Sequence, residues 1–194
     1  MAGLDLLNGL RIGEGTLEMA ILNLPDSGEV IEDFITIKTY LDARGIQLDQ
    51  WQASTEFSAD ASQEEILAAY QHEIDPYMKE HGFVKADIIA VNSETPNIES
   101  IRQKFLPEHT HSEAEARYFI EGEGQFFFHL EDGDNEQVLL LHCFKGDFLS
   151  VPAGAKHWFD MAPAYNVKCI RIFSTEEGWV ANYTGSEIDK KYNK

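Results

Sequence analysis

Basic side chains are scarce in this sequence. Its 194 residues include 15 lysines and arginines against 34 aspartates and glutamates, which gives a formal charge of −19. Affinity for nucleic acid depends on cationic side chains that displace counterions from phosphate groups. The deficit therefore argues against DNA, RNA and acidic membrane surfaces as partners.

Cysteines and long apolar runs are scarce as well. Cys143 and Cys169 are the only thiols; they are too few for a disulfide scaffold, and we interpret both as buried small apolar residues. No stretch approaches the roughly 18 uninterrupted apolar residues of a membrane span. The start of the chain lacks the basic and apolar segments of a signal peptide. We therefore expect a soluble, cytoplasmic protein.

The composition that remains is sufficient for a folded core, since 43% of the residues are hydrophobic. The length is typical of one domain, and we expect residues 1–194 to form a single domain. Residues 1–108 mix helical patterns with short strands, whereas strand patterns dominate from residue 109 to about residue 175.

Two helices are predicted in the first part of the chain. Ser62 and Glu65 have the spacing of a capping box, which predicts a helix start. The pattern is interrupted at Pro76, where we expect a kink or a restart, and Gly82 is expected to end it. A second helix is predicted from Pro96 to residue 106, with the proline at its first position.

Two further segments precede the strand-rich part. Residues 86–91 have the composition of a short buried strand. Residues 34–44 are ambiguous, because their β-branched side chains favour a strand while the glycine that follows resembles a helix end. We favour a helix for this segment.

The second half of the chain is rich in predicted strands separated by turn-forming residues, one such turn being residues 121–124. The predicted strands are residues 117–120, 125–130, 138–141, 147–151 and 167–173. Short strands punctuated by glycine predict an antiparallel sandwich or barrel. The fold class is therefore mainly β with helices, an α+β chain whose helical elements are N-terminal.

A candidate metal site lies where the strand-rich part begins. In an extended chain His109 and His111 project to the same face, and Glu115 keeps that parity. A His-x-His pair alone is more often structural, but His157, behind a Pro-x-Gly turn, would add a further donor. Three imidazoles and one carboxylate suit Fe²⁺, Ni²⁺, Mn²⁺, Co²⁺ or Zn²⁺, so these ligands alone do not name the metal.

These residues carry a resemblance to a known family. The spacing resembles the two-part cupin motif: His109-x-His111-x3-Glu115-x6-Gly122, then Gly146-x5-Pro152-x-Gly154-x2-His157. More narrowly, His157-Trp158-Phe159-Asp160 and Gly178-Trp179-Val180-Ala181 resemble the acireductone dioxygenase family. The resemblance covers about residues 85–185. It implies a cupin antiparallel β-barrel, also called a jelly roll or double-stranded β-helix, preceded by helical elements.

The resemblance also implies a reaction. Members of this family oxidise acireductone, 1,2-dihydroxy-3-keto-5-methylthiopentene, with O2 in the methionine salvage pathway. One Fe²⁺ or Ni²⁺ ion per chain would be held by His109, His111, Glu115 and His157. The iron form would give 2-keto-4-methylthiobutyrate and formate, and the nickel form 3-methylthiopropionate, formate and carbon monoxide. The sequence does not decide which metal is bound.

Two charged residues beside the ligands have expected roles. By parity Arg117 faces the metal, where a permanent positive charge would favour a doubly deprotonated enediol; the alternative is an ordinary salt bridge. The resemblance implies the same catalytic role. Glu108 points away from His109 by parity, and the resemblance links it to metal incorporation; a solvated carboxylate is the alternative.

Aromatic residues complete the expected site. Phe105, Phe159 and Trp179 match positions that line the substrate pocket of the family, although core packing is their ordinary role. We interpret the remaining histidines as structural or exposed, because none has an acidic or histidine partner at ligand spacing. They are His72, His81, His129 and His142.

Two other functions compete with this interpretation. One is another metal-dependent cupin enzyme, such as a sugar-phosphate isomerase or a dioxygenase for a different enediol. The other is a non-catalytic cupin that binds a small molecule. Neither explains why Arg117 occurs together with the two tryptophan-containing motifs. No heptad pattern predicts a coiled coil, and we expect a monomer.

Overall fold

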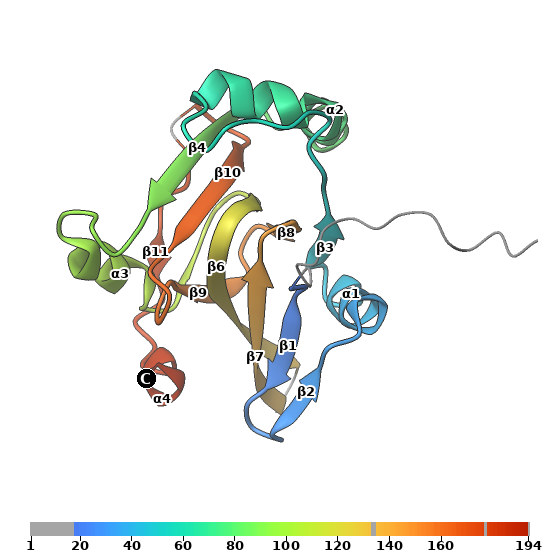
Figure 1. Ribbon diagram of the computed structural model, residues 1–194. Coiled ribbons are helices and arrows are strands. Elements are labelled where there is room, and N and C mark those ends of the chain that lie inside the picture. Colours follow the sequence, from blue (N-terminus) through green and yellow to red (C-terminus); the bar gives the residue numbers. More distant parts are fainter. Residues whose placement is uncertain (1–17, 133–134, 177, 194) are drawn as a thin grey trace, which may run out of the picture.

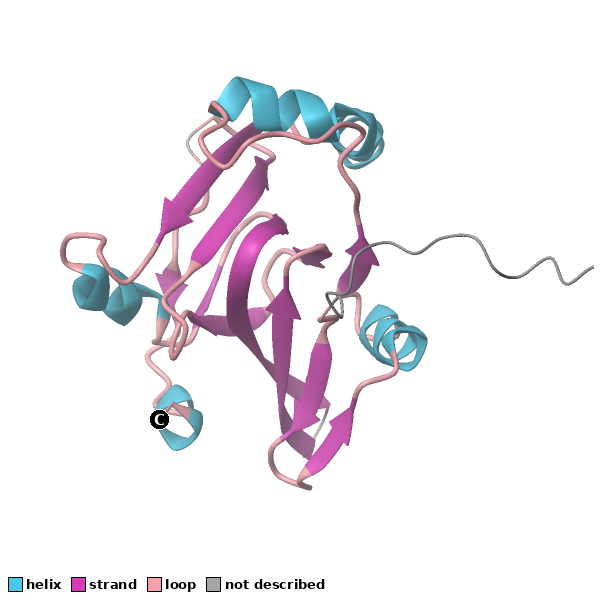
Figure 2. Cartoon of the chain, in the orientation of Figure 1, coloured by secondary structure: helices cyan, strands magenta, loops and turns pink. Residues whose placement is uncertain are grey.

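The computed structural model describes residues 18–132, 135–176 and 178–193. In these residues the strands form one 11-stranded sheet in which all pairs are antiparallel, and the sheet curls into a barrel (Figures 1 and 2). The strands are β1 (Ile21–Leu24), β2 (Glu29–Ile31), β3 (Gln47–Gln50), β4 (Lys85–Val91), β5 (His109–Thr110), β6 (Glu115–Asp132), β7 (Asn135–Phe144), β8 (Asp147–Val151), β9 (Lys156–Asp160), β10 (Val167–Phe173) and β11 (Asn182–Tyr183). The helices are α1 (Phe34–Asp42), α2 (Gln63–His81), α3 (Ile98–Phe105) and α4 (Asp189–Tyr192).

Strand β6 organises the barrel. Its first half pairs with β8 and β10, and its second half pairs with β7 and β9. The strand therefore runs through both sides of the barrel, as the long curved ribbon near the centre of Figure 1 shows. This continuity corrects the sequence prediction, which placed a turn at residues 121–124 and split β6 into two strands.

Gly122 is the reason for the false turn. It has a φ of 75°, and the pairing of β6 with β10 shifts register two residues before it, at Ile120. A glycine in this conformation close to a bulge lets the strand bend without reversing the chain. The glycine pattern therefore marked a real irregularity but not the end of a strand.

Two apolar clusters hold the sheet. The barrel interior is filled by buried side chains that include Phe119, Phe126, Phe128, Leu139 and Leu149. A second cluster lies between α2 and the sheet, and α2 spans the top of the view in Figure 1. Cys143 and Cys169 are fully buried, as predicted, and burial raises the pKa of the Cys169 thiol to about 12.

The predicted helix over residues 63–81 is confirmed. The Ser62 side chain accepts a hydrogen bond from the backbone of Glu65, and the Glu65 carboxylate accepts one from the backbone of Ser62. Gly82 ends the helix with a φ of 74°. The expected restart of the helix at Pro76 is wrong, because α2 continues through this exposed proline; the alternative of a kink stays a prediction.

The other predicted elements differ in detail. Residues 34–42 form a helix, whose start is capped by Asp33. Helix α3 begins at Ile98 rather than at Pro96, because Asn97 has a left-handed φ of 58°. Strand β4 confirms the strand predicted at residues 86–91, but its side chains are only partly buried because β10 is its one partner among the described strands.

No helix in the described part of the chain is long and apolar enough to cross a membrane.

We predict that Gly122→Ala destabilises the fold severely. A Cβ at this position would lie 1.9 Å from the backbone oxygen of Asn166, which also accepts a hydrogen bond from Glu123. Gly28 has the same φ of 75° but no atom within 4 Å of an added Cβ. Gly28→Ala should therefore cost only about 1 kcal/mol of unfolding free energy from backbone strain, whereas Gly122→Ala should cost about 3 kcal/mol or more.

Urea unfolding of both variants measures this difference. Equal losses of unfolding free energy would contradict the close approach to Asn166 as the constraint.

Candidate metal centre

Three buried histidines meet at one end of the barrel. His109 in β5 pairs directly with His157 in β9, and His111 follows β5. Nitrogen atoms of the three rings lie within 4.8 Å of one another. Glu115 begins β6 and is also buried. The structure therefore brings together the four residues that the sequence proposed as ligands.

Glu115 reaches the histidines in a different way from the one that the sequence predicts. Alternation along an extended chain was expected to bring Glu115 onto the face of the two histidines. Instead the chain bends at residues 112–113, between His111 and Glu115. The carboxylate reaches the site because β6 pairs with β8 and β9 around the barrel.

Backbone carbonyls fix the orientation of all three rings. The Nδ1 atoms lie 2.8–2.9 Å from carbonyl oxygens: His109 from Pro107, His111 from Val180 and His157 from Ala155. A carbonyl oxygen can only accept, so each Nδ1 carries the proton and donates it. Each Nε2 of a neutral ring then has a free lone pair, the form in which histidine binds metal.

The Glu115 carboxylate faces two of these lone pairs. Its Oε2 lies 3.0 Å from His111 Nε2 and 3.1 Å from His157 Nε2. Its Oε1 accepts a hydrogen bond from Arg117 Nε at 2.5 Å. Lone pairs directed at a carboxylate oxygen repel it unless a cation lies between them. Nitrogen and oxygen donors in this arrangement fit a first-row transition metal.

The protonation states also suit metal binding. Burial, followed by the neighbouring His157, lowers the pKa of His109 to about 4. Burial opposes the charge of Glu115, but the positive charge of the neighbouring Arg117 holds the pKa of Glu115 well below its usual range. At neutral pH His109 is therefore neutral and Glu115 is ionised, as metal ligands must be.

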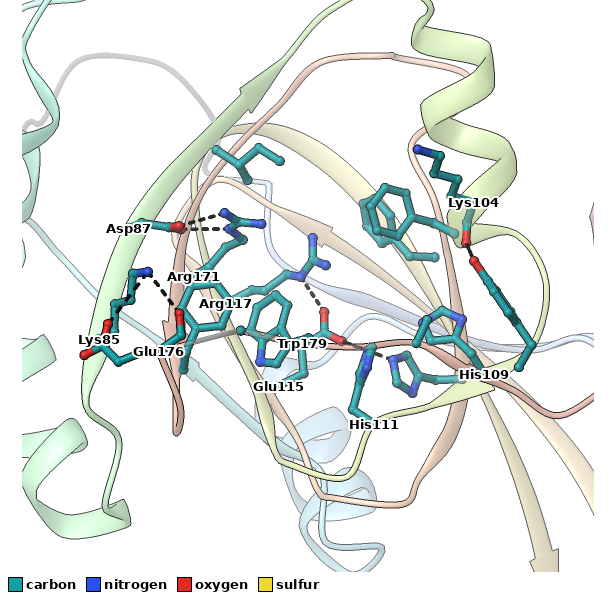
Figure 3. A pocket seen from close by; sticks show the side chains of 18 residues that line it. Lys85, Asp87, Lys104, His109, His111, Glu115, Arg117, Arg171, Glu176 and Trp179 are labelled. Atoms are coloured by element: carbon teal, nitrogen blue, oxygen red, sulfur yellow. Dashed lines mark hydrogen bonds and ion pairs between the residues drawn. The ribbon is translucent and has the colours of Figure 1, made fainter.

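A cavity of about 360 Å³ opens beside these residues. Its walls include the three predicted aromatic residues, Phe105 from α3, Phe159 from β9 and Trp179. Arg117 also lines it, with its guanidinium carbon 5.0 Å from the ring centre of Trp179 and 5.3 Å from that of Phe159 (Figure 3). The aromatic residues therefore line the cavity, as expected.

Another wall of the cavity has no signal in the sequence. Asp87 in β4 and Arg171 in β10 form two hydrogen bonds of 2.8 and 2.7 Å and line the cavity opposite α3 (Figure 3). They are opposite each other in the β4–β10 register. Since 84 residues separate them in the sequence, no local pattern indicates this pair.

Glu108 points away from the histidines, as its parity predicted. Its carboxylate is buried, accepts a hydrogen bond from Thr184 Oγ1 at 2.6 Å and lies 2.5 Å from His129 Nδ1. The opposite nitrogen of His129 lies 2.9 Å from Glu136. The alternative of a solvated Glu108 is therefore wrong.

His129 and His142 also have acidic partners that sequence spacing did not reveal. His142 in β7 lies 3.2 Å from Glu123 in the neighbouring strand β6. Glu108, the partner of His129, precedes β5.

The sequence is similar to a known family and to named members of it. Residues 27–181 match the model of the ARD/ARD' family. The chain is similar to the acireductone dioxygenase of Aquifex aeolicus, with 46% identity over 172 residues, covering 87% of this chain and 92% of that protein. It is also similar to the acireductone dioxygenase of Picosynechococcus sp., with 44% identity over 174 residues, 90% of this chain and 97% of that protein.

A solved structure is similar as well. It is an acireductone dioxygenase from Bacillus anthracis with a cadmium ion in its active centre. The TM-score is 0.76 and the sequence identity is 28%, with 86% of this chain and 99% of that chain covered.

We predict that His157→Ala removes tight metal binding. The variant loses one of three converging nitrogen donors. Removing only a hydrogen-bond partner of a metal ligand typically lowers metal affinity about 10-fold or more. Loss of the ligand itself should therefore lower the affinity for Fe²⁺ or Ni²⁺ by at least about 10-fold. His72→Ala is the matched control, because His72 is exposed on α2. Elemental analysis after dialysis measures the metal per chain. Full metal content in His157→Ala would contradict the assignment.

Proposed function

The chain belongs to the ARD/ARD' family and is a metal-dependent dioxygenase that acts on acireductone and O2; from this we propose which of its residues perform the reaction. The proposed metal ligands are His109, His111, Glu115 and His157. The observation that supports them best is that backbone carbonyls hold all three Nδ1 atoms, which leaves three Nε2 lone pairs beside one buried carboxylate.

The metal is proposed to be a single Fe²⁺ or Ni²⁺ ion per chain. When bound, such an ion supplies Lewis-acid and redox chemistry to the two enediol oxygens of the substrate. We propose the products of the family for each metal: 2-keto-4-methylthiobutyrate and formate with iron, and 3-methylthiopropionate, formate and carbon monoxide with nickel. Nitrogen and carboxylate donors accept both ions, in agreement with this proposal.

Arg117 is proposed to stabilise the doubly deprotonated substrate. Its Nε is bonded to Glu115, while the described residues provide no hydrogen-bond partner for its terminal nitrogens. Figure 3 shows the guanidinium group directed into the cavity. A permanent positive charge in this buried place lowers the free energy of an enediol dianion, which is an electron-rich partner for O2.

The three aromatic walls are proposed to bind the methylthio chain. Phe105 and Phe159 pack edge to face with ring centres 6.4 Å apart, and Trp179 lies on the other side of Arg117. Apolar surface of this kind excludes water and accepts an uncharged thioether chain. Glu108, linked by His129 and Thr184 to neighbouring segments, is proposed to assist metal incorporation rather than to bind substrate.

We further propose that the chain acts as a cytoplasmic monomer and that residues 1–194 form one domain. The ligands, the arginine and all cavity walls described above come from one chain, so the site is complete without a second copy. Two buried, unpaired cysteines are compatible with a reducing compartment. The excess of acidic residues supports the expectation that neither nucleic acid nor a membrane is a partner.

The reaction itself can be tested with the metal as the variable. Protein freed of metal and reloaded with either Fe²⁺ or Ni²⁺ is mixed with acireductone without oxygen, and O2 is then admitted. We expect O2 consumption to exceed the spontaneous rate only with metal, and carbon monoxide to form only with nickel. Metal-loaded protein that does not accelerate O2 consumption would contradict the proposed function.

If Arg117 stabilises the substrate dianion, its removal should lower turnover without lowering the metal content. Arg117→Met should lower kcat about 100-fold, the usual effect of removing one preorganised charge-stabilising donor. Metal content at saturating Fe²⁺ should stay near one per chain, because all four ligands remain. Arg171→Met, which removes another cavity arginine, is the control for a general change in charge. Unchanged turnover in Arg117→Met would exclude the proposed role.

A further inference from the structure

Cationic side chains are concentrated around the cavity of this acidic protein. Four of them line it, namely Lys85, Lys104, Arg117 and Arg171. Three have carboxylate partners: Arg117 with Glu115, Arg171 with Asp87, and Lys85 with Glu176. Among the described residues, no carboxylate lies within ion-pair distance of Lys104. Lys104 therefore presents an uncompensated positive charge.

Lys104 lies at the rim of the cavity on a well-anchored element. It is exposed in the last turn of α3, next to Phe105. Figure 3 shows its ammonium group extending above the cavity, on the side opposite Arg171. Its backbone oxygen accepts a hydrogen bond from the Tyr183 hydroxyl at 3.0 Å.

The helix itself is fixed by a nearly buried ion pair. Arg102 of α3 donates two hydrogen bonds, of 2.7 and 2.8 Å, to Asp160 at the end of β9. Asp160 is only 5% exposed. The position of Lys104 at the rim is therefore set by the fold and not by the flexible side chain alone.

The negative charge of the substrate makes a positive charge at the rim of the cavity favourable for binding. An enediol conjugated to a ketone is acidic, because its conjugate base spreads the negative charge onto the ketone oxygen. The substrate therefore approaches as an anion, while the protein has a net charge of −19. A positive group at the mouth of a cleft reverses the local potential and raises the local concentration of an anionic ligand.

We propose that Lys104 is a specificity-determining residue that attracts and selects the ionised enediol at the mouth of the cavity. The proposal rests on the enediol substrate of the proposed function. Lys104 acts during approach and binding, whereas Arg117 stabilises the bound dianion at the bottom of the cavity. The two residues therefore have separable kinetic effects.

The test compares two lysines that carry the same charge. Lys104→Met removes the rim charge, and Lys79→Met removes an exposed charge on α2, outside the cavity lining. Lys104→Arg restores the rim charge. The Kd of acireductone is measured without oxygen by the change in tryptophan fluorescence of metal-loaded protein, to which Trp179 in the cavity wall contributes. The constants KM and kcat are measured separately at low and at high ionic strength.

We expect Lys104→Met to raise Kd and KM about 3- to 10-fold at low ionic strength, because it removes one charge of a cleft whose whole field typically contributes about 10-fold or more. Its kcat should stay within about twofold, and the defect should shrink below about twofold near 0.5 M salt, where the screening length is only a few ångströms. Lys79→Met and Lys104→Arg should bind like the natural chain.

Two results would overturn the proposal. One is a Kd for Lys104→Met equal to that of Lys79→Met. The other is a loss of affinity that is the same at all salt concentrations, which would indicate packing rather than charge. If the natural chain itself does not bind acireductone without oxygen, the substrate assignment fails instead. The experiment therefore distinguishes the two failures.

Discussion

The Glu115 carboxylate connects the fold to the chemistry. It is a buried negative charge, and its desolvation must be offset by neighbours. Arg117 is such a neighbour, with its Nε 2.5 Å from Oε1, while the Nε2 atoms of His111 and His157 lie 3.0 and 3.1 Å from Oε2, where they could share a cation with it. Each comes from a segment that the barrel holds beside the start of β6. The carboxylate therefore stays ionised despite its burial because the folded barrel holds Arg117 against it.

Strand β6 transmits this constraint to the core, because its side chains alternate between two environments. Glu115 and Arg117 face the cavity, while Tyr118 belongs to the aromatic cluster under α2. The Tyr118 hydroxyl is bonded to the Tyr70 hydroxyl at 3.0 Å and to the backbone oxygen of Trp51 at 3.1 Å. Packing of α2 on the sheet thus fixes the strand on which the site depends, and this explains the need for the helical N-terminal part.

The sequence predicted those features that depend on local geometry. The capping box at Ser62 requires only neighbouring residues, and the ligands could be proposed because the cupin motif places them at fixed spacings. The failures occur where distant segments decide the outcome. Gly122 bends β6 because the chain near Asn166 passes against it, and Glu108, which contacts His129, lies 21 residues earlier in the chain. No pattern in a single segment contains that information.

The segment after β10 shows why the metal ligands and the substrate cavity cannot be separated. Val180 provides the carbonyl that orients the His111 ring, and its neighbour Trp179 lines the cavity beside Arg117. Two residues further on, β11 pairs with β5, where Tyr183 lies opposite His109. A displacement of this segment would rotate a ligand and open the cavity together. Metal geometry and substrate enclosure are thus two consequences of one short stretch of backbone.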